Sequence, residues 1–176
     1  MLEIIMLIIV IITILLLIIV INNNKFQFSI IKIDKAEEDI SIYLDKKKEL
    51  LNRARPIILK ELKLDTFLEN LDDNLDEMNN FQEYELLKND YNKFFKTLDE
   101  NEKLLKSENL LSILEDLNDN EEDIVGAIKF YNDTVVEFNK LLVSFPSNII
   151  GFFKRYKRKD FYNDEKREIF EILNDR

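Results

Sequence analysis

The chain opens with an unbroken apolar stretch before any polar pattern begins. Residues 4–21 (IIMLIIVIITILLLIIVI) carry no charged side chain. In an α-helix such a stretch spans about 27 Å, close to the thickness of the hydrocarbon core of a bilayer. No Lys or Arg precedes it and Asn22-Asn23-Asn24 follows it, which favours an uncleaved anchor over a cleaved secretory signal. We therefore expect a transmembrane anchor over residues 1–24.

After the anchor, apolar residues recur every three or four positions, which is the period of an amphipathic helix. The first such stripe predicts a helix that continues out of the anchor to about Leu64, and it consists of Ile33, Ala36, Ile40, Leu44, Leu51, Ala54 and Ile58. Pro56 lies inside this helix. Because no turn residues surround the proline, we expect a kink there rather than a chain reversal.

Three further helices are predicted from the same period. A short one begins at a capping box, Thr66 to Glu69, and ends near Asn79, with the stripe Phe67, Leu71, Leu75 and Met78. The next carries Tyr84, Leu87, Tyr91, Phe94, Leu98 and Leu105. The last is expected over residues 108–144, interrupted only by Glu121, with the stripe Leu110, Leu114, Leu117, Ile124, Ile128, Tyr131, Val135, Phe138 and Leu142.

These patterns predict an all-α fold, in which a transmembrane helix continues into an antiparallel bundle of about four helices with a short C-terminal tail. The chain has only two Gly and two Pro, too few for the tight turns of a sheet protein. We expect an anchor over 1–24, a helical bundle over 25–150 and a basic and aromatic segment over 151–176.

Charge changes the picture in two ways. The net charge of -10 is concentrated in residues 61–125, which hold 6 basic and 20 acidic side chains, and an acidic body repels nucleic acid. We expect no nucleic-acid partner. Lys25, Lys32 and Lys35 follow the anchor, and basic residues stay on the cytoplasmic side. This predicts a single-pass protein of the cell membrane, held in lipid through residues 4–21, with its N-terminus outside and its body in the cytoplasm.

The residue types present exclude most catalytic sites. With no His and no Cys, neither Ser-His-Asp nor Cys-His systems nor the usual zinc sites can form, and two glycines cannot supply a phosphate-binding loop. The carboxylate clusters Asp72, Asp73, Asp76 and Glu77, and Glu121 to Asp123, are either solvated acidic faces or ligands for a hard cation in a metal-dependent hydrolase. We assign no catalytic residue, no cofactor and no metal.

One segment combines cations with aromatic rings: Phe152, Phe153, Lys154, Arg155, Tyr156, Lys157, Arg158 and Lys159. Lysine and arginine are attracted to an anionic bilayer, and aromatic rings favour its headgroup region. We predict a membrane-surface contact here, because the last helix is long enough to retrace the first and end beside the membrane. Two alternatives are base stacking on nucleic acid and a solvated turn whose Phe side chains cover the end of the bundle.

Residues 107–153 resemble the C-terminal helix of LemA family proteins. The motifs that carry the resemblance are Phe130-Tyr131-Asn132, Asn139 and Phe145-Pro146-Ser147-Asn148. Residues 33–51 are similar to the first soluble helix of that family, with Lys46-Lys47 at its basic pair, although Glu37 stands where the family commonly has Trp.

The resemblance implies a membrane-anchored helical bundle with no established enzymatic activity, and magnetosome proteins of that family suggest a role in membrane organisation. Asn132 and Asn139 are seven residues apart, on one side of the last helix. Their amides are expected either to bond to a neighbouring helix and fix its register or to form a ligand or partner surface. We expect a non-enzymatic scaffold or interaction protein that holds an unidentified protein partner at the membrane. The alternative is a regulatory or sensor component of a membrane signalling pathway.

Overall fold

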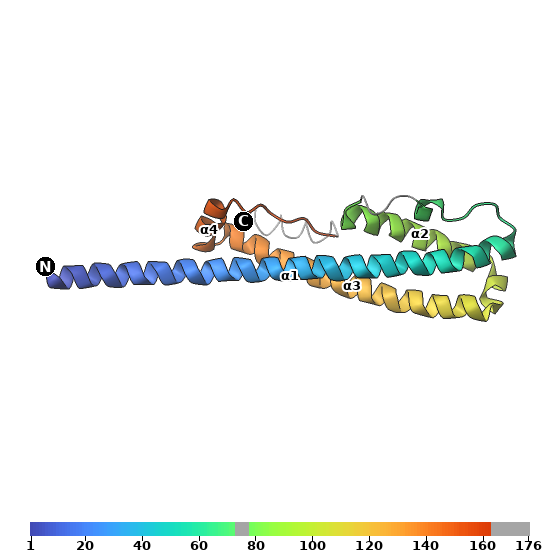
Figure 1. Ribbon diagram of the computed structural model, residues 1–176, viewed down its shortest axis with the longest axis horizontal. Coiled ribbons are helices and arrows are strands. Elements are labelled where there is room, and N and C mark those ends of the chain that lie inside the picture. The colour runs from blue at the N-terminus through green and yellow to red at the C-terminus, as the bar shows by residue number, and fades with distance from the viewer. Residues whose placement is uncertain (73–77, 163–176) are drawn as a thin grey trace. The chain divides into compact units, whose positions relative to one another are not determined.

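The computed structural model describes residues 1–72 and 78–162, and every regular element in them is a helix. In chain order these are α1 (Leu2–Leu62), the 3-10 helix η1 (Glu69–Asp72), α2 (Asn80–Glu100), the 3-10 helix η3 (Glu102–Lys106), α3 (Glu108–Val143) and α4 (Ser147–Lys154) (Figure 1). The all-α prediction is confirmed. The described residues form two compact units, a first unit of residues 1–36 with 129–162 and a second unit of residues 37–128.

Helix α1 follows the predicted stripe closely. Every residue of that stripe is buried, from Ile33 to Ile58, and the helix continues through Pro56 without a chain reversal. At its N-terminal end the pattern is reversed, because the large apolar side chains up to Ile21 are exposed, apart from the half-buried Ile18. This helix is long and apolar enough to cross a membrane.

The helix predicted from Thr66 to Asn79 is wrong over its described part. Thr66 belongs to no helix, and Leu68 has a positive φ of 53°, the left-handed conformation that an α-helix of L-residues excludes. Only the four residues of η1 are helical. Phe67, Leu68 and Leu71 are nonetheless buried, so this segment buries its apolar side chains without forming an α-helix. Leu75, and the carboxylates of Asp73, Asp76 and Glu77, lie outside the described residues.

Helix α2 starts at Asn80, directly after a capping box formed by Asn79 and Gln82. The side chain of Asn79 accepts from the Gln82 N–H at 3.0 Å, and the Gln82 side chain accepts from the Asn79 N–H at 3.3 Å. The helix ends at Glu100, so Leu105 falls in η3, where it is exposed. Its buried face consists of Glu83, Leu87, Asp90, Phe94 and Leu98. Tyr84 and Tyr91, predicted for the core, are half-buried at its border.

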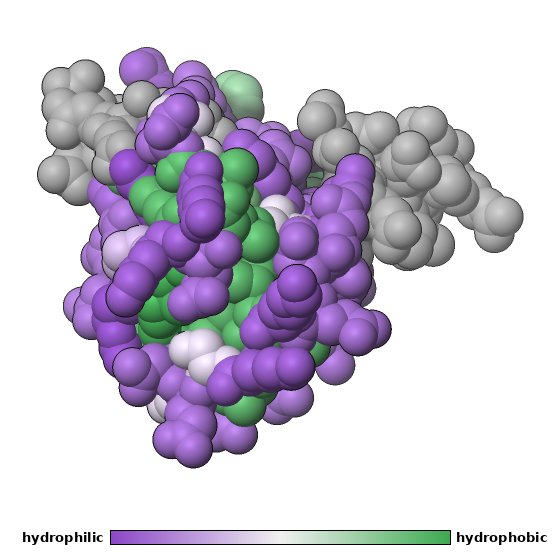
Figure 2. Space-filling model, turned by 90° about the vertical axis from the view of Figure 1, so that its right-hand side faces the viewer, coloured by the Kyte–Doolittle hydropathy of each residue, from purple (hydrophilic) through white to green (hydrophobic). Residues whose placement is uncertain are grey.

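Helix α3 has the predicted length and register. From Leu110 to Phe138 its stripe is buried, and the helix passes through residues 118–123 without a turn. Leu142, expected in the core, is half-buried. Figure 2 looks onto the end of the second unit at which α1 ends and α3 begins, where apolar side chains are visible between hydrophilic ones.

Candidate membrane-facing site and a buried polar cluster

The chain leaves α3 through a turn that hydrogen bonds hold together. The N–H of Ser144 donates to the Lys140 carbonyl at 3.0 Å, and the N–H of Asn148 donates to the Ser144 carbonyl at 2.8 Å. The Ser147 hydroxyl donates to that same carbonyl at 3.0 Å, and Pro146 has no N–H to place. The Phe145-Pro146-Ser147-Asn148 motif therefore builds a turn in which the Ser144 carbonyl accepts two hydrogen bonds.

Helix α4 follows this turn and approaches α1 and α3 at a glycine. A Cβ at Gly151 would lie 2.9 Å from Leu142 Cδ2 and 3.4 Å from Phe26 Cζ. Only glycine allows this approach without moving a neighbour. The turn and α4 also form a groove of about 280 Å³ with the apolar stretch of α1, lined by Leu15, Ile18, Ile19, Phe145, Pro146, Ile149 and Ile150. Residues 145–151 therefore lie beside the last turns of the apolar stretch and the residues just after it.

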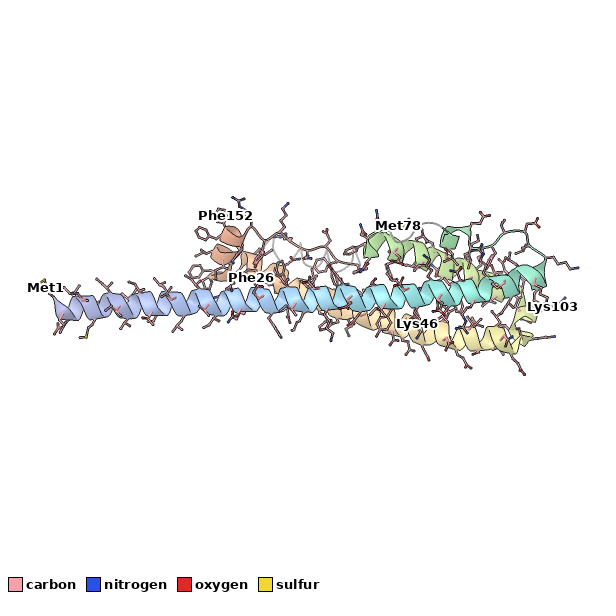
Figure 3. The ribbon with its side chains drawn as sticks, viewed as in Figure 1. Met1, Phe26, Lys46, Met78, Lys103 and Phe152 are labelled. Carbon is pink, nitrogen blue, oxygen red and sulfur yellow. The ribbon has the colours of Figure 1, made fainter. Side chains whose placement is uncertain are left out.

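The outer side of this region exposes large apolar side chains. Phe145 and Phe152 are each 80% exposed, and Phe153 is 77% exposed. Figure 3 labels Phe152 on α4 and Phe26 on α1 close by. The alternative in which Phe152 and Phe153 cover the end of the bundle is wrong, because both face outward. The sequence did not predict α4 as a helix, since its eight residues are too few for a clear period.

We call residues 154–159 the basic segment. Aromatic contacts hold its first residues beside α1. The Tyr156 ring lies 5.1 Å from the Phe26 ring and 6.0 Å from the Phe138 ring, centroid to centroid. The Gln27 amide donates to the Tyr156 hydroxyl at 2.8 Å. Lys154, Arg155, Lys157 and Arg158 are exposed and Lys159 is half-buried. Within the first unit the cations thus lie level with residues just beyond the apolar stretch.

The two motif asparagines fasten the end of this segment. The Asn139 side chain makes two hydrogen bonds of 3.0 Å to the backbone of Lys159, accepting from its N–H and donating to its carbonyl. The Asn132 side chain accepts from the Tyr162 N–H at 3.0 Å, and the Tyr131 hydroxyl donates to the Asp160 carbonyl at 3.2 Å. The partner is therefore the backbone of residues 159–162, a segment outside any helix, and not the neighbouring helix that the spacing suggested. We call these three side chains the clasp.

A polar cluster lies inside the second unit. The Lys47 side chain is 1% exposed, and its ammonium lies 2.6 Å from a Glu121 carboxylate oxygen and 4.2 Å from the centre of the Tyr91 ring. Burial lowers the pKa of Lys47, and the hydrogen bond and charge of Glu121 oppose that shift. Burial likewise raises the pKa of Tyr91.

The sequence contains a signal for this cluster that the apolar stripes alone do not reveal. Lys47 stands three residues after Leu44 and four before Leu51, at the one step where the first stripe lacks an apolar residue. Glu121 is the corresponding interruption in α3. Two stripes that each skip one core position, one with a cation and one with an anion, indicate a buried ion pair between them.

The carboxylates of residues 121–123 do not come together as a site in the part of the chain that the structure describes. Glu121 is paired with Lys47, while Glu122 and Asp123 are exposed. In residues 1–72 and 78–162 no group of three or more metal-ligating side chains comes together. Nothing here supports the hydrolase alternative for residues 121–123.

Comparison with known proteins identifies the chain's family. The model of the LemA family matches residues 43–172. Searches of curated proteins and of solved structures return no match. The matched region is nearly three quarters of the chain, and it contains both the Phe145 to Asn148 turn and the clasp. The chain belongs to the LemA family.

Proposed function

We propose that this protein is a membrane-anchored, non-enzymatic scaffold at the inner face of the cell membrane. The observation that carries this proposal is the placement of α4 and the basic segment beside the end of the apolar stretch of α1. One surface of the first unit then faces lipid at two depths, with Phe side chains at the hydrocarbon boundary and cations at the headgroups. The second unit is free to hold a partner protein.

The depths follow from the rise of the helix. Phe26 and Gln27 are five and six residues beyond Ile21, the end of the apolar stretch, so they stand about 8 Å outside the hydrocarbon. The headgroup layer on each side of a bilayer is about 5–8 Å thick. Tyr156, which contacts both residues, therefore lies at its outer edge. Lys154 to Lys159 lie around this level, where each cation contributes about 1 kcal/mol on an anionic surface, and less as salt screens it.

Orientation is tested with a single cysteine, since the chain has none of its own. Asn118 is exposed in α3, and we expect Asn118→Cys to react with an impermeant maleimide only after cells are permeabilised. Labelling in intact cells would place the body outside and contradict the proposal.

Docking of α4 is tested with a single tryptophan, since the sequence contains no Trp. In the full chain, reconstituted in nanodiscs, Phe153→Trp should be quenched by lipids brominated on their acyl chains. The matched control is Phe130→Trp, an exposed position on α3 about 20 Å along the helix from Val143. Equal quenching at the two positions would refute the placement of α4 in the bilayer.

The scaffold role itself is tested by crosslinking from photoreactive residues on the exposed face of the second unit in intact membranes. A defined protein partner should be recovered that is absent when the second unit, residues 37–128, is replaced by an unrelated helical linker. Recovery of the same proteins without the second unit would contradict the role.

A further inference from the structure

The basic segment and α4 line a second cavity, open to the surface, next to the apolar groove. It has a volume of about 730 Å³, and its polar lining comes from Asn148, Arg155, Tyr156 and Arg158. Its apolar lining includes Leu142 and Ile149, and Ile149 also lines the groove. The two cavities therefore adjoin, one wholly apolar and one cationic.

The two cavities lie at depths that match the two halves of a lipid molecule. The groove contacts Leu15 to Ile19, which lie about 3–9 Å inside the end of the apolar stretch. Tyr156, which lines the cationic cavity, contacts Gln27, about 13 Å further along α1 than Ile18. A ligand that reached both would have an acyl chain at one end and an anion at the other.

The cationic cavity also contains an acceptor that none of the described residues uses. The Asn148 side-chain oxygen is buried and accepts no hydrogen bond within residues 1–72 and 78–162. A buried amide oxygen that accepts no hydrogen bond favours a ligand with a hydrogen-bond donor, such as a hydroxyl group. Guanidinium groups such as those of Arg155 and Arg158 bind phosphate in a planar, paired geometry.

We propose that these two cavities form a binding site for one anionic phospholipid whose headgroup carries a hydroxyl group. The upper part of an acyl chain lies in the groove against Ile18 and Ile19, the phosphate lies at Arg155 and Arg158, and the headgroup hydroxyl donates to Asn148. The proposal rests on the docking of α4 described above and adds to it a defined lipid. A charged surface alone would hold a changing population of anionic lipids, whereas this site holds one molecule.

The test uses the full chain in detergent with phosphatidylglycerol and phosphatidylcholine supplied in equal amounts, and native mass spectrometry counts the bound lipids. We expect one bound phosphatidylglycerol per chain and a preference over phosphatidylcholine on the order of tenfold, since two cations contribute. Soluble glycerol 3-phosphate at the same concentration should not displace the lipid, because it has no chain for the groove.

Two sets of variants separate the parts of the site. The charge variant is Arg155→Asn with Arg158→Gln, where Asn suits the positive φ of 56° at position 155; it should reduce the preference to about onefold. Its control is Lys60→Gln with Lys103→Gln, two exposed lysines of the second unit. The groove variant is Ile19→Trp, which should displace the lipid, and its control is Ile12→Trp, on the same helix face one heptad deeper. Ile12 and Ile19 are both about half exposed, so neither change disturbs the core.

Each outcome decides the proposal. Equal retention of both lipids by the unmodified chain, an unchanged preference in the charge variant, or release by glycerol 3-phosphate alone would overturn it. If Ile12→Trp displaced the lipid as strongly as Ile19→Trp did, the groove would not be the site. None of these results would affect the quenching of Phe153→Trp, which reports on the proposed function separately.

Discussion

The Lys47 and Glu121 pair gives the sharpest test of the packing in the second unit. The two side chains are unequally buried, with Lys47 1% and Glu121 29% exposed. Glu121→Gln removes the negative charge and keeps the shape and a carbonyl oxygen that can still accept from the ammonium. The variant therefore leaves a buried cation with a neutral partner.

The cost follows from the geometry. At 2.6 Å and an effective dielectric constant of about 20, two unit charges attract by about 6 kcal/mol before the desolvation of both is counted. Removing one partner of a buried pair costs about 2–5 kcal/mol. Because Glu121 is partly open to water and the Tyr91 ring still faces the ammonium, we expect the low end, about 2–3 kcal/mol. Lys47→Met should cost less, because the Glu121 carboxylate left behind can turn toward water.

Thermal unfolding of the full chain in detergent, followed by circular dichroism, measures the effect. A loss of 2–3 kcal/mol corresponds to a fall in Tm of about 4–12 °C for a protein of this size. The control is Glu122→Gln, the exposed neighbouring carboxylate, which should leave Tm within about 2 °C. If Glu121→Gln were no worse than this control, or if Lys47→Met were the more destabilising change, the buried pair would not be the contact that the structure shows.

Three further changes test other parts of the fold. Phe138 is 2% exposed and packs edge to face on Phe26, so Phe138→Ala should lower the free energy of unfolding by about 3–5 kcal/mol, whereas the exposed Phe153→Ala should change the Tm little. Asn139→Ala removes both hydrogen bonds to Lys159, so hydrogen exchange at the Lys159 amide should accelerate by about tenfold or more. Unchanged exchange would show that the clasp does not hold residues 159–162. Burial lowers the pKa of Lys47 from 10.5, so at pH values just below 10.5 the unfolded chain binds more protons than the folded chain. The free energy of unfolding should therefore rise with pH between about pH 8 and about pH 10. In Lys47→Met, unfolding measured over the same range should lack this rise.

The long helices were predictable because each buries one continuous face. In α1 and α3 the apolar residues recur at helical spacing over many turns, so the period identifies both the element and its buried side. In α2 the same rule identified the helix and its buried Leu87, Phe94 and Leu98. It did not identify Glu83 and Asp90, which also lie on the buried face, and the two tyrosines lie on the border of that face. A pattern rule assigns tyrosine to the core and carboxylates to water, and α2 departs from both assignments.

Local backbone conformation explains the other errors. The segment after α1 has apolar residues at helical spacing, but Leu68 adopts a left-handed conformation, and no feature of residues 66–69 indicates this. The real capping box, Asn79 to Gln82, was present in the sequence as an Asn followed three residues later by a Gln. The clasp could be anticipated as a structural role for two asparagines on one helix side, but its partner could not, since residues 159–162 pair through backbone groups that every residue type shares.

The motif residues that carry the family resemblance share a physical role once they are placed in the fold. Asn132 and Asn139 bind the backbone of the C-terminal segment, with Tyr131 beside them, and the residues from Phe145 to Asn148 form a turn closed by two hydrogen bonds to the Ser144 carbonyl. Each of these contacts helps to fix where α4 and the cations lie relative to α3, and none prepares a nucleophile, an acid or a base. The motifs therefore determine where α4 and the basic residues lie, and together these form an apolar and cationic surface at the end of the apolar stretch. That surface, rather than any carboxylate in the acidic middle of the chain, is where a change of one side chain should alter function without unfolding the protein.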